Sequence, residues 1–211
     1  MVFLASSSAS RALLLKQAGI TYEQIAFDYD ESKICAIKTA PVSYSQAVVE
    51  QKVLQFKAHF GSQLGQFLER GAIIFADSSV FCKGQILGKA KDESHARAML
   101  ELQSGAKASV YSAMCVLAKD FTLSALSVAS YDFAPYPKRE IDKYIASGEY
   151  IGKAGAMMIE GFSGRYILSQ HGDISTAMGL DVPLLKYSFS SFAINSASPE
   201  FIIEVSPMRV R

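Results

Sequence analysis

The sequence has few of the residues that crosslink a chain through sulfur or through a metal. Three cysteines and three histidines occur among 211 residues. Cys35, Cys82 and Cys115 are odd in number, far apart and set among apolar neighbours, which suits free thiols in a reducing compartment better than a disulfide framework. The histidines stand alone, without zinc spacing or an H-E-x-x-H motif, so no histidine metal site is expected. We therefore expect a cytoplasmic protein.

The sequence also lacks an excess of charge and long apolar runs. Twenty-one basic residues face twenty acidic ones, which leaves a net charge of +1. This balance gives no sign of a nucleic-acid groove or of an anionic membrane as the main partner. No apolar segment approaches the ~20 residues that a membrane span needs, and the N-terminus has too short an apolar run and no basic lead for a signal peptide. We expect no nucleic-acid partner and no membrane partner.

Three common catalytic motifs are missing as well. Residues 84–89 are one residue short of a P-loop, and Ala90 stands where the magnesium-binding Ser or Thr must be. Residues 161–164 are not a G-x-S-x-G nucleophile elbow, because the second glycine comes one residue early. No glycine fingerprint for a dinucleotide occurs. Serine hydrolase chemistry and dinucleotide binding thus have no support.

The composition of the chain is typical of a globular protein. Half of them are apolar, and 211 residues can bury a large core. No repeat or low-complexity linker appears. We expect one domain, 1–211, in which any boundary is a cleft between two lobes of one sheet.

The central stretch of the chain carries an acid and lysines close to predicted strands. The apolar run 72–75 predicts a strand that is covered on both faces, and Asp77 follows it directly. The carboxyl ends of strands in α/β sheets face the ligand crevice, so Asp77 is the first catalytic candidate; the alternative is that it only forms a turn. Residues 80–88 predict a hairpin around a glycine turn, which leaves Lys89 just before a helix capped by Asp92.

The N-terminal stretch predicts an anion site. A short strand over 2–5 leads through serines into a helix that Gly19 ends. The free amides of a helix start, the hydroxyls of Ser6 and Ser8, and the planar guanidinium of Arg11 suit phosphate oxygens. The alternative is that one serine caps the helix and Arg11 lies in solvent.

Two further segments supply candidates. Residues 22–31 predict a strand that runs into acids, among them Glu31, with a solvated acidic loop as the alternative. The helix predicted over 44–60 carries Lys52 at the border of its apolar face, where a snorkelling surface lysine is the alternative. Residues 152–156 form a glycine-spaced loop that delivers Lys153.

The remaining elements follow from periodicity and turn residues. We expect a polar connector over 61–71, a long hairpin of strands 109–117 and 122–133, a helix over 140–146, a strand over 166–168 and a helix over 183–192.

Five ordered blocks of the chain resemble the Maf family of nucleoside triphosphate pyrophosphatases. LASSSASRALLL resembles L-A-S-x-S-P-R-R-x-x-L-L. FADSSV and ILGKAKDESHARAMLELQSG resemble A-D-T-V and L-G-K-P-x-D-x-x-E-A-R-x-M-L-x-x-L-S-G. EIDKYIASGEYIGKAGAMMIEG and HGDISTAMGLDVPLL are similar to E-I-x-x-Y-x-x-x-G-E-P-x-x-K-A-G-A-Y-G-I-Q-G and G-D-Y-S-N-V-V-G-L-P-L.

The resemblance implies a fold, an activity and a site. The fold is an elongated α/β mixed sheet flanked by helices, with two lobes and a central cleft. The activity is hydrolysis of a nucleoside triphosphate to the monophosphate and diphosphate, with Mg²⁺ or Mn²⁺ as cofactor, in a homodimer. Asp77 and Glu31 would be the catalytic and metal-binding acids. The substrate would be held by a set of cations and hydroxyls: Ser6, Ser8, Arg11, Lys52, Lys89 and Lys153.

The chain departs from the family pattern where base choice is expected. Ser10 replaces the first arginine of a pair, Ser78 replaces the threonine after the aspartate, and Glu160 replaces the glutamine of I-Q-G. The resemblance therefore leaves open whether dTTP and UTP or 7-methyl-GTP is preferred. An ionised Glu160 only accepts hydrogen bonds, which favours a base edge that presents donors. A second function, binding of nucleotide without turnover by a regulator of cell division, is also attached to the family.

Overall fold

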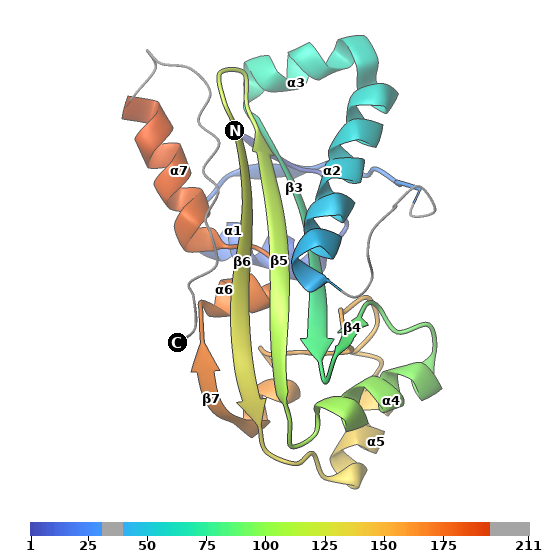
Figure 1. Ribbon diagram of the computed structural model, residues 1–211. Helices are drawn as coiled ribbons and strands as arrows, with labels where there is room; N and C mark the ends of the chain where they lie inside the picture. Colours follow the sequence, from blue (N-terminus) through green and yellow to red (C-terminus); the bar gives the residue numbers. More distant parts are fainter. Residues whose placement is uncertain (31–39, 195–211) are drawn as a thin grey trace.

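The protein, a computed structural model in which residues 1–30 and 40–194 are described, is built around one mixed sheet (Figure 1). The seven strands described lie in the order β2-β1-β3-β5-β6-β7, with β4 paired to β3. The strands are β1 (Val2–Leu4), β2 (Tyr22–Gln24), β3 (Ala72–Cys82), β4 (Gln85–Leu87), β5 (Lys107–Leu117), β6 (Thr122–Phe133) and β7 (Ile167–His171).

Helices cover the sheet. They are α1 (Ala9–Gln17), α2 (Pro41–Phe60), α3 (Leu64–Arg70), α4 (Glu93–Gln103), α5 (Lys138–Ser147), α6 (Ile174–Met178) and α7 (Val182–Ile194), with short 3-10 turns at Gly61–Gln63 and Ser163–Tyr166. No helix within the two described ranges has the length and apolar character to cross a membrane.

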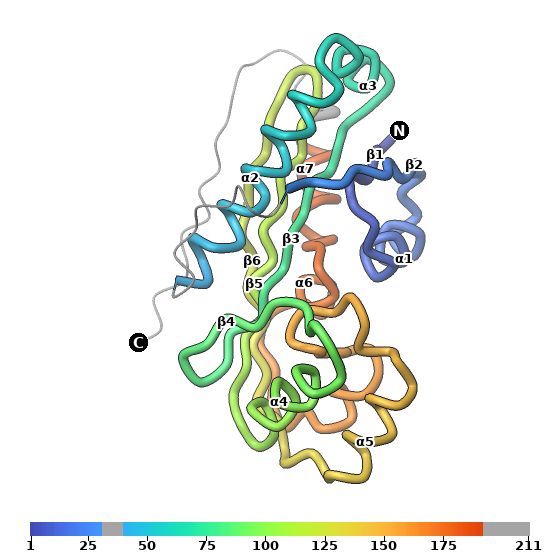
Figure 2. Tube along the Cα trace, turned by 90° about the vertical axis from the view of Figure 1, so that its right-hand side faces the viewer, coloured from blue at the N-terminus to red at the C-terminus, as the bar shows by residue number. Residues whose placement is uncertain are grey.

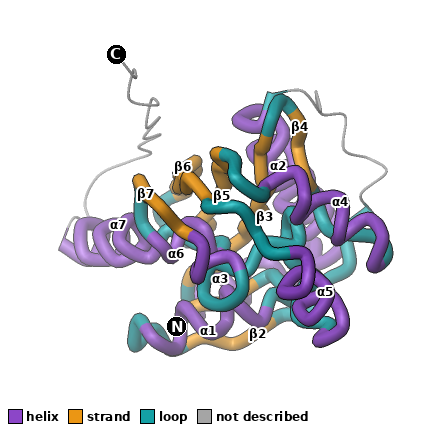
Figure 3. Tube along the Cα trace, turned by 90° about the horizontal axis from the view of Figure 1, so that it is seen from below, coloured by secondary structure: helices purple, strands orange, loops and turns teal. Residues whose placement is uncertain are grey.

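Alternation along β3 divides the core between the two faces of the sheet. Successive strand side chains point to opposite faces. Ile73 and Phe75 pack with Phe56 of α2, whereas Ile74 packs on the other face with Leu15 of α1. Figure 2 shows α2 on one side of the sheet and α1 on the other. Figure 3 shows α2 and α7 on opposite sides of β5 and β6. Each face of the strand thus has its own helical cover.

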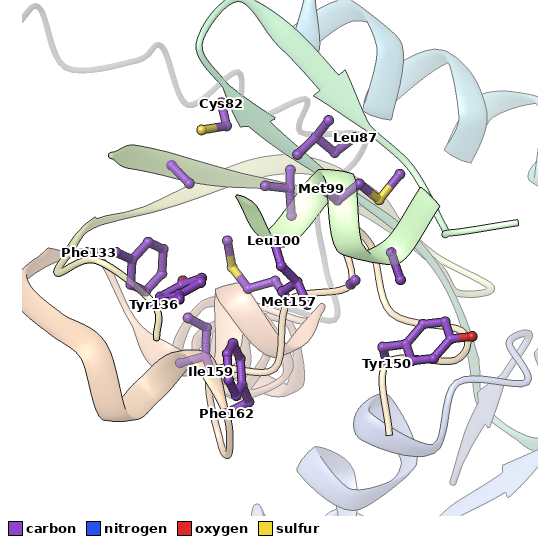
Figure 4. Packing of buried hydrophobic residues seen from close by; sticks show 14 of the residues in the cluster. Cys82, Leu87, Met99, Leu100, Phe133, Tyr136, Tyr150, Met157, Ile159 and Phe162 are labelled. Atoms are coloured by element: carbon purple, nitrogen blue, oxygen red, sulfur yellow. The ribbon is translucent and has the colours of Figure 1, made fainter. Parts of the chain in front are cut away.

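A second core fills the end of the sheet where α4 and α5 lie. Leu100 of α4 and Ile145 of α5 are buried in this cluster. Figure 4 shows Leu100 close to Met157, which comes from the irregular segment after α5. Phe162 stacks on the ring of Tyr144, with the ring centroids 4.5 Å apart. The segment between α5 and β7 is therefore held by buried side chains although it has little regular structure.

The structure corrects three predictions about the elements and adds one helix that was not predicted. Asp77 does not end a strand, because β3 continues to Cys82 and pairs Asp77 with Ala113 of β5. Residues 61–71 are not a connector, since α3 occupies most of them. The strand predicted over 22–31 is only three residues long, and residues 31–39 lie outside the described part. No element was predicted for residues 174–178, which form α6; periodicity did not reveal this helix because it has only five residues.

Candidate active site

A cleft of about 350 Å³ opens between the two ends of the sheet. Its walls come from the start of α1, the middle of β3, the loop after β4, the segment after α5 and the turn after α6. Ten residues that the sequence singled out line it: Ser6, Ser8, Ser10, Arg11, Lys52, Asp77, Ser78, Lys89, Lys153 and Glu160. Glu31, the remaining predicted residue, lies outside the described part of the chain. Segments far apart in sequence therefore meet at one cleft.

The cleft forms where β3 loses one of its neighbours. β1 pairs with β3 only as far as Ile74, and β4 pairs with it only from Val80 onward. Between these strands the edge of β3 faces the cleft instead of another strand. The ammonium of Lys52 donates to the carbonyl oxygen of Ala76 at 3.1 Å, so a side chain satisfies a backbone acceptor of this edge.

Lys52 and Asp77 form an ion pair at this edge. The Nζ atom of Lys52 lies 2.8 Å from Oδ1 of Asp77, and the two side chains are 10% and 19% exposed. Burial lowers the pKa of Lys52, and the negative charge of Asp77 opposes this effect. The ammonium also lies 4.5 Å from the centroid of the Tyr29 ring. Lys52 is therefore a buried cation with three electron-rich neighbours, and the snorkelling alternative is wrong.

Arg11 is buried in the opposite wall. Its guanidinium donates from Nε to the carbonyl oxygen of Gly179 at 2.8 Å, from Nη1 to Oγ of Ser6 at 3.0 Å and from Nη2 to Oγ of Ser78 at 3.2 Å. A guanidinium has five N–H donors, so these three bonds leave two for a ligand. Burial lowers the pKa of Arg11, and Asp77 opposes the shift. All three acceptors are neutral, so none of these hydrogen bonds neutralises the guanidinium, and its positive charge can act on an anion in the cleft. The alternative of a solvent-exposed Arg11 is wrong.

The start of α1 is capped as its sequence predicts. The backbone N–H of Arg11 donates to Oγ of Ser8 at 3.4 Å, and the N–H of Ser8 donates to Oγ of Ser6 at 3.3 Å. Both serines therefore belong to the cap as well as to the wall of the cleft. The capping alternative holds for Ser8, but it does not remove Ser8 from the cleft.

Three polar side chains meet at the rim. Lys153 donates from Nζ to Oε1 of Glu160 at 2.9 Å, and Ser10 of α1 donates to the same oxygen at 3.4 Å. The side chains of Lys153 and Glu160 are 21% and 25% exposed. The rim group thus connects α1 with the segment after α5 across the cleft.

Backbone contacts hold the loop that carries Lys153. The N–H of Gly155 donates to the carbonyl oxygen of Gly88 at 2.7 Å, and Lys89 forms an isolated bridge with Ala154. The side chain of Gln103 donates to the carbonyl oxygen of Gly155 at 2.7 Å. These contacts place Lys89 and Lys153 on neighbouring segments.

The charges of the cleft suit a polyanion. The charged residues in its described lining are four cations, Arg11, Lys52, Lys89 and Lys153, and two acids, Asp77 and Glu160, which leaves a net charge of +2 (four minus two). The whole chain has a net charge of only +1. Since clustered charge of one sign in a concave site attracts ligands of the opposite sign, the cleft is suited to bind a polyphosphate.

One acid in the described lining of the cleft, Asp77, could contribute a ligand to a metal ion. The described part of the chain contains no group of three or more His, Cys, Asp or Glu side chains that could hold a metal ion. Mg²⁺ is often held by one or two carboxylates together with substrate phosphates. Asp77 supplies one carboxylate, and its bond to Lys52 leaves acceptor capacity on a group with about four acceptor sites.

Several residues of the site gave no sign in the sequence. Phe27 and Tyr29 line the cleft, although residues 22–31 drew attention only for their acids. Gly179 supplies the carbonyl oxygen for Arg11 and has φ +111°; a Cβ there would lie 3.1 Å from Nε of Arg11. Its left-handed backbone and close approach both favour glycine. The only available signal was its place in the block HGDISTAMGLDVPLL.

Comparisons with known proteins agree over most of the chain. A family described as Maf-like protein matches residues 1–192. The chain is 41% identical over 186 residues to the nucleoside triphosphate pyrophosphatase of Campylobacter jejuni subsp. jejuni serotype O:23/36 (strain 81-176), which is 88% of this chain and 98% of that protein. It is 31% identical over 194 residues to the dTTP/UTP pyrophosphatase of Acholeplasma laidlawii (strain PG-8A), which is 92% of this chain and 97% of that protein.

Among solved structures, the chain is similar to a HAM1 protein from Coxiella burnetii. The likeness covers 90% of this chain and 98% of that one, with a TM-score of 0.43 and 12% sequence identity. It is too weak to bear on the reaction.

Proposed function

Because the chain belongs to the Maf family, we propose that it is a nucleoside triphosphate pyrophosphatase, an enzyme that hydrolyses a nucleoside triphosphate to the monophosphate and diphosphate. The observation that carries the proposal is the cleft, in which a carboxylate lies among four cations. The relatives named above agree with it over 88% and 92% of the chain.

The reaction needs a water molecule directed at phosphorus and cations that stabilise the charge growing on the departing diphosphate. Asp77 is the proposed catalytic carboxylate. Lys52 holds one of its oxygens at 2.8 Å, so the carboxylate is fixed in orientation while its other acceptor sites serve the attacking water or the metal ion. Glu31 is the proposed second acid.

The remaining cations bind the phosphates in this proposal. Arg11 offers its two remaining N–H groups, Lys89 adds charge from the loop after β4, and Lys153 adds charge from the segment after α5. Ser6 and Ser8 complete the anion pocket at the start of α1. A bound Mg²⁺ or Mn²⁺ would stabilise negative charge on the phosphate oxygens as a Lewis acid, with Asp77 and Glu31 as its protein ligands.

In this proposal the rim residues Ser10, Lys153 and Glu160 select the base of the nucleotide. Glu160, which accepts from Lys153 and Ser10, would prefer a base edge that presents hydrogen-bond donors. Ser78 acts differently from Ser10, because its hydroxyl is engaged with Arg11. UTP, dTTP, CTP and 7-methyl-GTP assayed side by side test this idea, and a strong preference for UTP would count against it.

We further propose that the chain is one domain whose two lobes share this cleft, that it works in the cytoplasm and that it forms a homodimer. The thiols of Cys82 and Cys115 are free and buried, which is consistent with a reducing compartment. Light scattering after size-exclusion chromatography measures the oligomeric state, and a monomer at micromolar concentration would rule out the dimer.

Asp77→Asn tests the function. It keeps the shape of the side chain but weakens its acceptor strength, so we expect pyrophosphate release to be lost while nucleotide binding survives. Asp120→Asn, in the exposed turn after β5, is the matched control and should release pyrophosphate at the wild-type rate. Unchanged turnover in Asp77→Asn would remove Asp77 from the mechanism. A wild-type protein that binds nucleotides but releases no pyrophosphate would instead favour the non-catalytic regulator.

A further inference from the structure

A row of hydroxyl groups leads from Ser78, in the wall of the cleft, to the buried Ser112. Ser78 of β3 lies opposite Ser112 of β5, and their Oγ atoms are 2.7 Å apart. Ser112 in turn donates to the carbonyl oxygen of Thr176 in α6 at 2.7 Å. Ser112 is 3% exposed and is not among the residues that line the cleft.

The direction of each hydrogen bond in this row follows from chemistry. A carbonyl oxygen only accepts, so the single hydroxyl proton of Ser112 is used on Thr176. The proton between the two serines must therefore come from Ser78. Ser78 then has no proton left for another partner, and its oxygen accepts from Nη2 of Arg11 at 3.2 Å. Ser112 thus fixes Ser78 as an acceptor that faces the guanidinium.

The turn of α6 anchors both ends of the arrangement. The carbonyl oxygen of Thr176 receives the proton of Ser112, and that of Gly179 receives the Nε–H of Arg11. The N–H of Gly179 also donates to the carbonyl oxygen of Thr176 at 3.1 Å, which ties the two acceptors together. Two backbone carbonyls of one short turn therefore set the plane of the guanidinium from two directions.

We propose that Ser112 is a positioning residue for phosphate binding, which acts through Ser78 to hold the two remaining N–H groups of Arg11 toward the cleft. The inference rests on the proposed function for its substrate. Ser112 touches neither the cleft nor any ligand in it, so its effect must pass through Ser78. A merely structural serine would change stability, not the affinity for phosphate.

Ser112→Ala tests the proposal. The hydroxyl of Ser78 becomes free to turn, so we expect the Kd for inorganic triphosphate and the KM for a nucleoside triphosphate to rise about 10-fold, as the loss of about one hydrogen bond predicts. The kcat should change less than about threefold, because Asp77 and Lys52 are untouched. Ser112→Thr keeps the hydroxyl and should bind triphosphate like the wild type.

The matched control lies on the same strand. Ser109 forms a serine pair with Ser130 across β5 and β6, with their Oγ atoms 2.7 Å apart. Neither residue lines the cleft, so Ser109→Ala should leave the Kd for triphosphate unchanged. Thermal unfolding of each variant reports any loss of stability separately from binding.

A double-mutant cycle decides whether Ser112 acts through Ser78. In a Ser78→Ala background, Ser112→Ala should weaken triphosphate binding by less than about twofold, because the intermediate group is already gone. Wild-type affinity in Ser112→Ala, or an equal loss in both backgrounds, would overturn the proposal. Should Ser112→Ala fail to fold, Ser112→Cys, with a weaker donor of similar size, takes its place under the same criteria.

These binding measurements also separate the inference from the proposed function. If the wild type releases no pyrophosphate from any nucleotide, the function fails, while the triphosphate affinities still decide the role of Ser112. If the wild type turns over nucleotides and Ser112→Ala binds triphosphate normally, only the inference fails.

Discussion

Replacing Lys52 by methionine would test the central ion pair of the cleft. The substitution keeps a straight apolar stem and removes the ammonium that lies 2.8 Å from Asp77 and 3.1 Å from the carbonyl oxygen of Ala76. Losing a hydrogen bond to a charged group costs about 1.5–3 kcal/mol of stability. Relief of a buried ammonium opposes this cost, because desolvation is worth several kcal/mol per ion. We therefore expect a net loss in the free energy of unfolding below about 2 kcal/mol.

The effect on activity should be larger than the effect on stability. A cation about 4 Å from a phosphate oxygen interacts by about 4 kcal/mol at an effective dielectric constant of 20. Asp77 already offsets part of this charge, so about 2–3 kcal/mol remains for the transition state. That corresponds to a loss of about 30- to 160-fold in kcat/KM.

The assay measures pyrophosphate release with magnesium present, well below the Tm of each variant. Lys57→Met is the control, since Lys57 is an exposed lysine of the same helix that does not line the cleft. It should keep wild-type kcat/KM. If Lys52→Met stays within about threefold of the wild type, Lys52 contributes nothing to catalysis and the reasoning is refuted.

Three further predictions concern the core. The hydroxyl of Tyr131 is buried without a hydrogen-bond partner in the described ranges, so Tyr131→Phe should raise the free energy of unfolding by about 1 kcal/mol. Tyr144→Phe should lower the free energy of unfolding by about 1 kcal/mol, because the hydroxyl of Tyr144 donates to the carbonyl oxygen of Ala156. Denaturant titration measures both changes. Burial raises the pKa of Tyr131 to about 12, so the unfolded chain releases this proton first. Stability should therefore fall between pH 10 and 12, with a slope about 1.4 kcal/mol per pH unit shallower in Tyr131→Phe; equal slopes would contradict this. Phe56→Ala should lower the free energy of unfolding by about 3–5 kcal/mol, because this fully buried ring contacts four other phenylalanine rings. The same titration measures this change, and a decrease of less than about 1 kcal/mol would show that neighbouring side chains fill the cavity.

Much of the sheet could be predicted from local patterns. The apolar runs and turn residues of 109–133 predict the long hairpin of β5 and β6 because its partners are adjacent in sequence. The helix after Asp92 could be predicted for the same reason: Asp92 caps it with a bond to the N–H of His95, and its apolar period matches the buried residues. Local chemistry decides both elements.

Predictions failed where tertiary pairing outweighs local signals. Asp77 and the two serines after it are typical of a turn, but ten residues of β3, from Ile73 to Cys82, pair along β5 and keep them in the strand. Residues 61–71 contain three glycines and several polar residues, which suggested a connector. Leu64, Phe67 and Leu68 have helical spacing, and they pack on the core as α3. The helical spacing of these three residues was the sequence signal that predicts α3.

The candidate site divides in the same way. The cations and acids could be named from residue type and from resemblance, and those described line one cleft. Their roles stay predictions. Ser112 and Gly179 could not be named, because each contacts a residue more than 30 positions away, and only the strand register and the path of the α6 turn bring them together.

Neighbouring positions of β3 serve the two walls of the cleft separately: Asp77 bonds to a helix on one face of the sheet, and Ser78 bonds to Arg11 on the other. Deleting or inserting a single residue upstream in this strand would therefore exchange the acid and the hydroxyl, because a shift by one position turns every side chain to the opposite face. The length of the strand before Asp77 is thus as restricted as the identity of the acid itself. Homologous chains that work in the same way should therefore keep that length unchanged.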